Sequence, residues 1–200
     1  MRPRKAAGFT IYELMLVLAI AGVLFALAIP SMRQFVWNSR MTSSANDLLT
    51  AVYRARSESV KRHTQTVLCF TADSEAEEPE CDGDGTQGWV VFADTNSDGA
   101  ADPGEEVVVR HGPLPDTIRL KTMPSGNAGY VAFNAAGFAR DIGLGTDLAG
   151  IVMCDQRGNT ATTGPEYSAA RGVLISPTGR PQVTRAVEMI ADNENLGGCP

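Results

Sequence analysis

The chain opens with a long run of apolar residues. From Phe9 to Ile29 the only charged side chain is Glu13, and Pro30 follows the run. At about 1.5 Å of rise per residue, these 21 residues are long enough to cross the hydrocarbon core of a bilayer. The pattern therefore predicts a membrane-spanning helix over residues 9–29.

An ordinary secretory signal peptide is the alternative interpretation of this segment. It has a basic start and an apolar centre, and Ala26-Leu27-Ala28 resembles the usual cleavage site. Glu13 argues against it, because a carboxylate inside an apolar helix costs about 2.5–3.5 kcal/mol on insertion scales. A discarded segment has no reason to carry that cost, so we favour a helix that stays in the mature protein.

Beyond Pro30 the apolar residues become periodic. They recur at spacings of three and four with polar residues between them, which is typical of an amphipathic helix. We therefore expect a helical stem over residues 30–63, with Pro30 permitting a kink or a locally unwound segment. Helix from Phe9 to Arg62 would be about 80 Å long. The apolar positions are Met32, Phe35, Val36, Ala45, Leu48, Leu49, Val52, Ala55 and Val60.

The remaining residues, 64–200, read as a β-rich globular domain. Short β-branched and aromatic runs alternate with Gly, Pro, Asn and Asp, which indicates strands joined by turns. The predicted fold class is α+β: a long N-terminal transmembrane and amphipathic helix packed on an antiparallel sheet or sandwich. The eight expected strands are 66–71, 88–93, 106–111, 117–122, 130–134, 150–154, 172–176 and 182–186.

Charge and catalytic motifs narrow the classes of function. The 200 residues carry 17 Lys and Arg against 23 Asp and Glu, and Arg2, Arg4 and Lys5 precede Gly8. Without those three the balance is 14 against 23, a net charge of −9. Such an acidic body does not attract nucleic acid as a whole. No nucleophile-elbow, zinc-protease, P-loop or paired-carboxylate motif is present, so we expect no enzyme and no required cofactor.

The four cysteines indicate disulfides. Cys69, Cys81, Cys154 and Cys199 show neither C-x-x-C spacing nor nearby histidine pairs, which disfavours a zinc site. Disulfides need an oxidising compartment, in agreement with an exported protein. Four cysteines allow three pairings; we favour Cys69 with Cys81, which leaves Cys154 to hold the tail through Cys199.

The motif Gly8-Phe9-Thr10-Ile11-Tyr12-Glu13-Leu14-Met15 closely resembles the prepilin signal of type IV pilins and type II secretion pseudopilins. The resemblance implies that residues 1–8 are a leader and that prepilin peptidase cuts between Gly8 and Phe9 and methylates the new amine. It also implies an assembly role for Glu13. In a low-dielectric environment its carboxylate would pair with the amine of its own or a neighbouring subunit. Tyr12 departs from the usual aliphatic residue.

Further segments resemble the FimT, FimU and GspH group of minor pilins and pseudopilins. They are residues 46–62, 67–69, 88–94 and 175–180, whereas 73–88 and 158–170 look like loops that match weakly. The resemblance implies a bacterial single-pass inner-membrane protein with a periplasmic domain, later extracted into a filament. Its partners would be other pilins or pseudopilins, membrane lipid and the inner-membrane assembly machinery. A minor pilin that primes or caps a pilus tip and a secretion pseudopilin remain alternatives.

The loop after the second expected strand fits a calcium-binding template. Asp94, Asn96, Asp98 and Glu105 stand at ligand spacing with Gly99 between them, and Asp102 would act directly or through water. Strands flank the loop where the template has helices. The same residues also form Asx-turns between strands. A structural Ca²⁺ site and a turn closed by its own hydrogen bonds are therefore both open.

DNA binding is the last candidate activity. Some FimT-like relatives bind DNA through a C-terminal G-R-x-R motif, which here reads Gly179-Arg180-Pro181-Gln182 and lacks the second arginine. Arg185 is the nearest substitute. The alternative interpretation is a strand end with exposed arginines, which agrees better with the acidic body.

Overall fold

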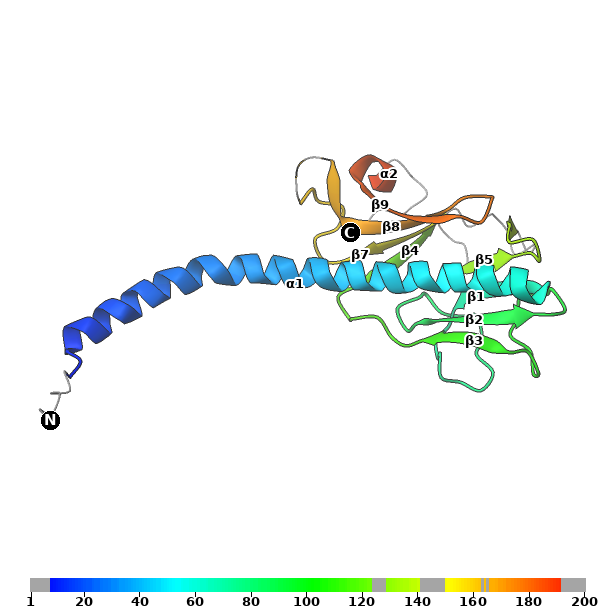
Figure 1. The fold of residues 1–200 in the computed structure, drawn as a ribbon, viewed down its shortest axis with the longest axis horizontal. Coiled ribbons are helices and arrows are strands. Elements are labelled where there is room, and N and C mark those ends of the chain that lie inside the picture. The colour runs from blue at the N-terminus through cyan, green and yellow to red at the C-terminus, as the bar shows by residue number, and fades with distance from the viewer. Residues whose placement is uncertain (1–7, 124–128, 141–149, 163, 165, 192–200) are drawn as a thin grey trace, which may run out of the picture. The chain divides into compact units, whose positions relative to one another are not determined.

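The computed structural model describes residues 8–123, 129–140, 150–162, 164 and 166–191 (Figure 1). Within those residues the chain forms two helices and nine strands. Its internal contacts divide it into two compact units, Met1–Ser39 and Arg40–Pro200. The division falls inside the first helix, so the part of the stem after Ser39 belongs to the globular unit.

Helix α1 (Ile11–Arg62) has defined signals at both ends. Thr10 is its N-cap: its hydroxyl accepts a hydrogen bond from the backbone N–H of Glu13 at 3.2 Å. His63 ends the helix with a positive φ of 54°, and Lys61 and Arg62 lie in the last turn, where cations are favourable. The residues stay helical through Pro30, so no unwound segment forms there.

The part of α1 before Pro30 is apolar apart from Glu13, and it is exposed on all sides. Its large side chains, such as Leu18, Leu24 and Phe25, are more than half exposed. Among the described residues α1 is the one helix long and apolar enough to cross a membrane.

Nine strands form two antiparallel sheets in the second unit. The five-stranded sheet has the order β3-β2-β1-β5-β6 and the four-stranded sheet the order β4-β7-β8-β9. The strands are β1 (Gln65–Phe70), β2 (Trp89–Asp94), β3 (Val107–His111), β4 (Arg119–Met123), β5 (Tyr130–Phe133), β6 (Ala139–Arg140), β7 (Gly150–Cys154), β8 (Tyr167–Ile175) and β9 (Pro181–Ala186), followed by α2 (Val187–Ala191).

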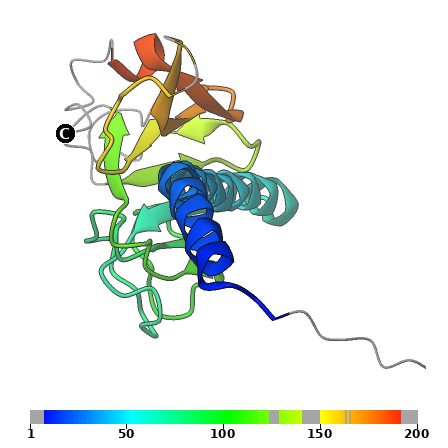
Figure 2. The same ribbon diagram turned by 90° about the vertical axis from the view of Figure 1, so that its left-hand side faces the viewer.

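The main core lies where residues 40–62 of α1 meet both sheets (Figures 1 and 2). One stripe of the helix, including Met41, Leu48 and Val52, is fully buried. Burying a side chain of this size contributes about 1.5–3 kcal/mol. Its partners come from the five-stranded sheet (Leu68, Phe70, Trp89, Val91, Phe133) and from the four-stranded sheet (Ile151, Met153, Val173, Ile175).

The structure confirms the α+β class with a long helix on antiparallel sheets. Each of the eight expected strands is present to within a few residues at its ends, except that β8 begins at Tyr167 instead of residue 172. The expected loop over 158–170 is therefore wrong in its last part. Residues 168–171 carry small and polar side chains with weak strand preference, yet they are buried. The two-residue strand β6 and the helix α2 were not expected.

Candidate functional site

The expected processing site lies just before the first turn of α1. Gly8 and Phe9 are exposed and precede the first helical residue, Ile11, by three and two residues. Added bulk at Gly8 would meet no atom within 4 Å. The leader residues 1–7 lie outside the described part of the chain. A cut between Gly8 and Phe9 would leave the helix and its cap intact, because both begin after Phe9.

Glu13 forms a capping box with Thr10. One oxygen of its carboxylate accepts hydrogen bonds from the backbone N–H and from the hydroxyl of Thr10, both at 3.0 Å. The carboxylate therefore stands beside the residue that follows Phe9, where the amine of a processed chain would begin. Sequence reasoning assigned Glu13 to assembly and missed Thr10, although the T-x-x-E spacing is a readable capping signal.

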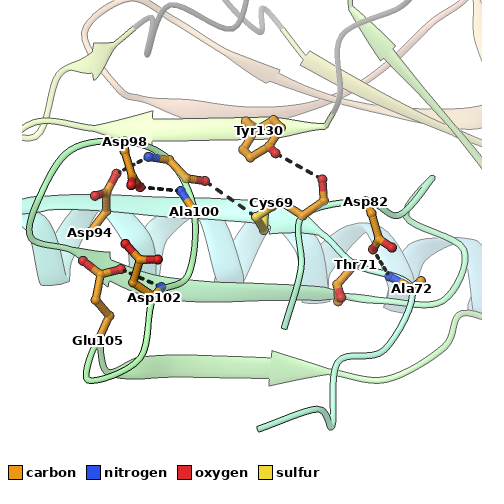
Figure 3. Close-up of a disulfide and its surroundings, with 12 residues drawn as sticks. Cys69, Thr71, Ala72, Asp82, Asp94, Asp98, Ala100, Asp102, Glu105 and Tyr130 are labelled. Carbon is orange, nitrogen blue, oxygen red and sulfur yellow. Dashed lines mark hydrogen bonds between the residues drawn. A yellow bond between two sulfur atoms is a disulfide. The ribbon is translucent and has the colours of Figure 1, made fainter. Parts of the chain in front are cut away.

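The first pair of cysteines forms a disulfide, as expected. Cys69 in β1 is bonded to Cys81 across 12 residues, with a Cα–Cα distance of 5.5 Å (Figure 3). The hydroxyl of Tyr130 donates to the carbonyl of Cys81 at 3.1 Å and holds the same loop against β5. Cys154 is fully buried and is not a free thiol. Its expected partner, Cys199, lies outside the described residues.

The five residues of the calcium template are engaged in hydrogen bonds within their own loop. Asp94 ends β2, fully buried, and its carboxylate accepts from the N–H groups of Ser97 (2.6 Å) and Gly99 (3.0 Å). Gln65 adds a third hydrogen bond, from its amide nitrogen, at 2.6 Å. These contacts make the loop an Asx-turn that uses the carboxylate itself.

The other template residues bond to one another and to the backbone. In Figure 3 the N–H of Ala100 donates to Asp98 and the N–H of Asp102 donates to Glu105. Asn96 donates to Asp98 at 2.9 Å and to Asp102 at 2.7 Å. Glu105 accepts from the N–H of Thr95 at 2.6 Å. In the described part of the chain no three acidic, histidine or cysteine side chains gather closely enough to hold a metal ion. The geometry agrees with the turn interpretation, and calcium binding stays a prediction.

The two candidate DNA-binding arginines lie at opposite ends of β9. Arg180 is exposed in the turn before the strand. Arg185 is engaged at the far end, where its guanidinium donates to the Thr162 hydroxyl at 3.1 Å and lies 5.7 Å from the centre of the Tyr167 ring. The two do not form one basic patch. DNA binding stays a prediction.

A groove between α1 and the β8–β9 turn was not foreseen. The hydroxyl of Tyr53 donates to the carbonyl of Pro181 at 3.3 Å, and Nε of Arg56 donates to the carbonyl of Gly137 at 2.9 Å. Both acceptors are backbone atoms far away in the sequence. No local pattern marks such a site, so the sequence carried no signal for it.

A chain of ion pairs fastens the end of α1 to β3. Arg62 contacts Glu58 and Glu106, both at 2.8 Å, and Glu58 is buried. The guanidinium of Arg62 lowers the pKa of the Glu58 and Glu106 carboxyls by hydrogen bonding to each. This network fixes the helix end and carries no chemistry of its own.

Comparison with known proteins places the chain among pilin-like subunits. The pilin-like protein PilA1 of Thermus thermophilus is 33% identical over 122 residues, which cover 60% of this chain and 69% of the relative. The crystal structures of the type IV minor pilin FimU of Pseudomonas aeruginosa PAO1 align with TM-scores of 0.49 and 0.42 at 19% and 18% identity. These alignments cover 75% and 72% of this chain and 92% and 91% of the FimU chains.

The family profile described as type II transport protein GspH matches residues 44–179, more than half of the chain. The match begins in the buried part of α1 and ends in the β8–β9 turn, so it includes the five-stranded sheet and every strand of the four-stranded sheet except β9. The chain therefore belongs to the GspH family.

Proposed function

We propose that this chain is a structural minor pilin of a type IV pilus, which primes or caps filament assembly near the tip. The observation that carries the proposal is the union of a GspH-family globular unit with an apolar, exposed helix on one polypeptide. The helix anchors the chain in the inner membrane, and the globular unit faces the periplasm. Its role is assembly, with other pilins as partners.

The apolar part of α1 explains how one segment serves two environments. Its side chains are exposed on every side, so they need a lipid or a protein covering. Lipid covers them in the membrane, and the helices of neighbouring subunits cover them in the filament. Moving between the two exchanges one apolar surrounding for another, which costs far less than exposing the helix to water.

Glu13 limits how neighbouring helices can pack in the filament. A carboxylate in an apolar surrounding is costly unless a cation or hydrogen-bond donor compensates it. Thr10 supplies donors within the chain, at 3.0 Å. Cleavage after Gly8 by prepilin peptidase adds a positive amine at Phe9. Pairing between this amine and the Glu13 of a neighbouring subunit would favour one axial stagger between their helices.

The first test is intact and N-terminal peptide mass spectrometry of the protein from its native membrane. We expect a chain that starts at methylated Phe9. The variant Gly8→Leu should remain unprocessed, because it changes the residue before the cut. Gly22→Ala, away from the cut, should be processed normally. Neither position has a neighbouring atom within 4 Å, so neither change should disturb the fold. A start after Ala28, or unprocessed wild-type protein, would contradict the proposal.

The alternative is a minor pseudopilin of a type II secretion system. It shares the processed helix and the same family, so processing does not separate the two. A deletion strain does: loss of surface pili with normal protein export supports the pilus subunit. Lost export with normal pili would support the pseudopilin.

A further inference from the structure

The groove beside the β8–β9 turn has the size and chemistry of a docking site. Its volume is about 560 Å³, and it lies within the globular unit. Tyr53 and Arg56 come from α1, and Leu174, Arg180, Pro181 and Gln182 come from β8, the turn and β9. The groove is therefore built jointly by the helix and by the edge strand of the four-stranded sheet.

The guanidinium groups of Arg56 and Arg180 line the groove. Arg56 donates to the neutral carbonyl of Gly137, which fixes its orientation. No ion pair joins Arg56 or Arg180 to any described residue, and none of the described carboxylates lines the groove. Guanidinium groups bind carboxylates through paired, charge-assisted hydrogen bonds. The groove is thus complementary to an acidic segment.

Exposed apolar side chains lie in the groove, at Tyr53, and on the helix and the turn next to Arg56. Tyr53 is 49% exposed and Val60 is 45% exposed on the helix, and Phe138 is 50% exposed in the turn after Gly137. A Cβ at Gly137 would lie 2.9 Å from Val60, so this turn rests on the helix beside Arg56. Aromatic side chains combined with arginine are typical of protein–protein interfaces.

A complementary acidic loop connects β1 and β2 of the five-stranded sheet. Residues 73–84, between β1 and β2, carry seven exposed carboxylates: Asp73, Glu75, Glu77, Glu78, Glu80, Asp82 and Asp84. The Cys69–Cys81 disulfide holds this loop, and Arg110 donates to the carbonyls of Ser74 (2.7 Å) and Ala76 (2.6 Å). The loop is therefore presented in a fixed shape.

The acidic loop and the groove lie at different heights along α1. The loop leaves the sheet at Phe70 and returns at Trp89, whose stacking partner His111 lies near Asp47 of α1. The groove begins six residues later on the helix, at Tyr53, and Arg56 lies about 14 Å beyond Asp47. One copy can therefore offer its loop to the groove of another while its own groove stays free.

We propose that two copies of this chain associate head to tail, with the acidic loop of one copy docked in the groove of the next. Glu77, Glu78 and Glu80 are exposed and make no hydrogen bond or ion pair with the described residues. They would pair with Arg56 and Arg180, while Tyr53 and Phe138 cover the apolar part of the contact. The inference rests on the proposed function, because both copies must enter one filament.

The test is photo-crosslinking of the full-length chain in its native membrane and in sheared filaments. A benzophenone amino acid at Gln182 should give a dimer, with the crosslinked peptide falling within residues 72–88. Arg180→Glu should lower the dimer yield about tenfold, as expected for the loss of one charge-assisted contact. The double change Glu77→Arg and Glu78→Arg should restore it. Arg54→Glu, on the same helix but outside the groove, is the matched control and should change nothing.

The outcomes separate this inference from the proposed function. Crosslinks to a different pilin, to DNA or to nothing, in filaments that contain the chain, would overturn head-to-tail pairing and leave the filament role standing. Absence of the chain from filaments would overturn the proposed function itself. Failure of the compensating charge reversal to restore the dimer would also refute the pairing.

Discussion

Replacing Asp94 by alanine should strongly destabilise the globular unit. Its carboxylate is fully buried at the end of β2 and accepts three hydrogen bonds, from Ser97, Gly99 and Gln65. Alanine would leave two backbone N–H groups and one side-chain amide without an acceptor. An unsatisfied buried donor costs much more than the net gain of an ordinary hydrogen bond.

The structure gives the order of magnitude of this loss. A hydrogen bond to a charged group contributes about 1.5–3 kcal/mol, so three of them set an upper limit of about 9 kcal/mol. The loop that follows Asp94 is exposed, and its backbone N–H groups can turn to water after the substitution. We therefore expect the free energy of unfolding to fall by about 3–5 kcal/mol, a large fraction of the about 5–15 kcal/mol of a typical domain.

The assay is urea unfolding of the detergent-solubilised chain, followed by the fluorescence of the buried Trp89. Asp98→Ala is the matched control: Asp98 is exposed and belongs to the same loop, so its loss should cost less than about 1 kcal/mol. Each variant is measured in Ca²⁺ and in chelator. A loss below about 1 kcal/mol for Asp94→Ala, or one seen only with Ca²⁺, would refute the turn interpretation and favour a bound ion.

Three further predictions concern other parts of the globular unit. Loss of the Cys69–Cys81 disulfide in the double variant Cys69→Ala and Cys81→Ala should lower the free energy of unfolding by about 3 kcal/mol, measured by urea unfolding against wild type. Gly179→Ala should cost about 2–4 kcal/mol, because φ is +74° and the new Cβ would collide with a backbone carbonyl. The pKa of Glu58 is lowered in the folded state, so its contribution to the free energy of unfolding is complete well above pH 4.5 and is lost as the pH falls through the folded-state pKa. The thermal midpoints of wild type and Glu58→Gln should therefore converge in acid.

The glycine and glutamate predictions each have a matched control. Gly104→Ala keeps a positive φ of 95° but meets open space, so it should cost only about 1–2 kcal/mol. Glu80→Gln removes an exposed carboxylate that forms no ion pair with the described residues, so its thermal midpoint should stay close to that of wild type. Equal costs for the two glycine variants would show that the close approach at Gly179 is unimportant. An unchanged gap between wild type and Glu58→Gln in acid would contradict the assigned ion pair.

Local patterns predicted most of the fold. Apolar continuity over 9–29 and helical periodicity up to Arg62 depend on neighbouring residues alone, and both match α1. The division of the strands between two sheets does not follow from local pattern, because β1 pairs with β5 and β4 with β7 across long connections. The early start of β8 also escaped prediction, since Ala169 and Ala170 show little strand preference outside their buried setting.

The sequence predicted those parts of the candidate site whose residues lie close together along the chain. Cys69 and Cys81 are 12 residues apart, and a local pair is the simplest closure. The calcium template could not be decided from sequence, because Asx-turns use the same residue types and only the burial of Asp94 shows which way its carboxylate faces. The groove could not be predicted from the sequence, because Tyr53 and Arg56 donate hydrogen bonds to carbonyls 128 and 81 residues away.

The apolar segment of α1 before Pro30 has no polar face, and this affects its rotation about its own axis. Met15, Val17 and Val23 point in different directions around the helix and are each more than half exposed. Rotation of such a helix about its own axis replaces one apolar face by another. Its apolar residues therefore do not fix the rotation angle of the helix relative to its neighbours. Glu13 is the sole charged group in that segment. The rotational orientation of a subunit relative to its neighbours must therefore be set by this carboxylate together with the surfaces of the globular unit.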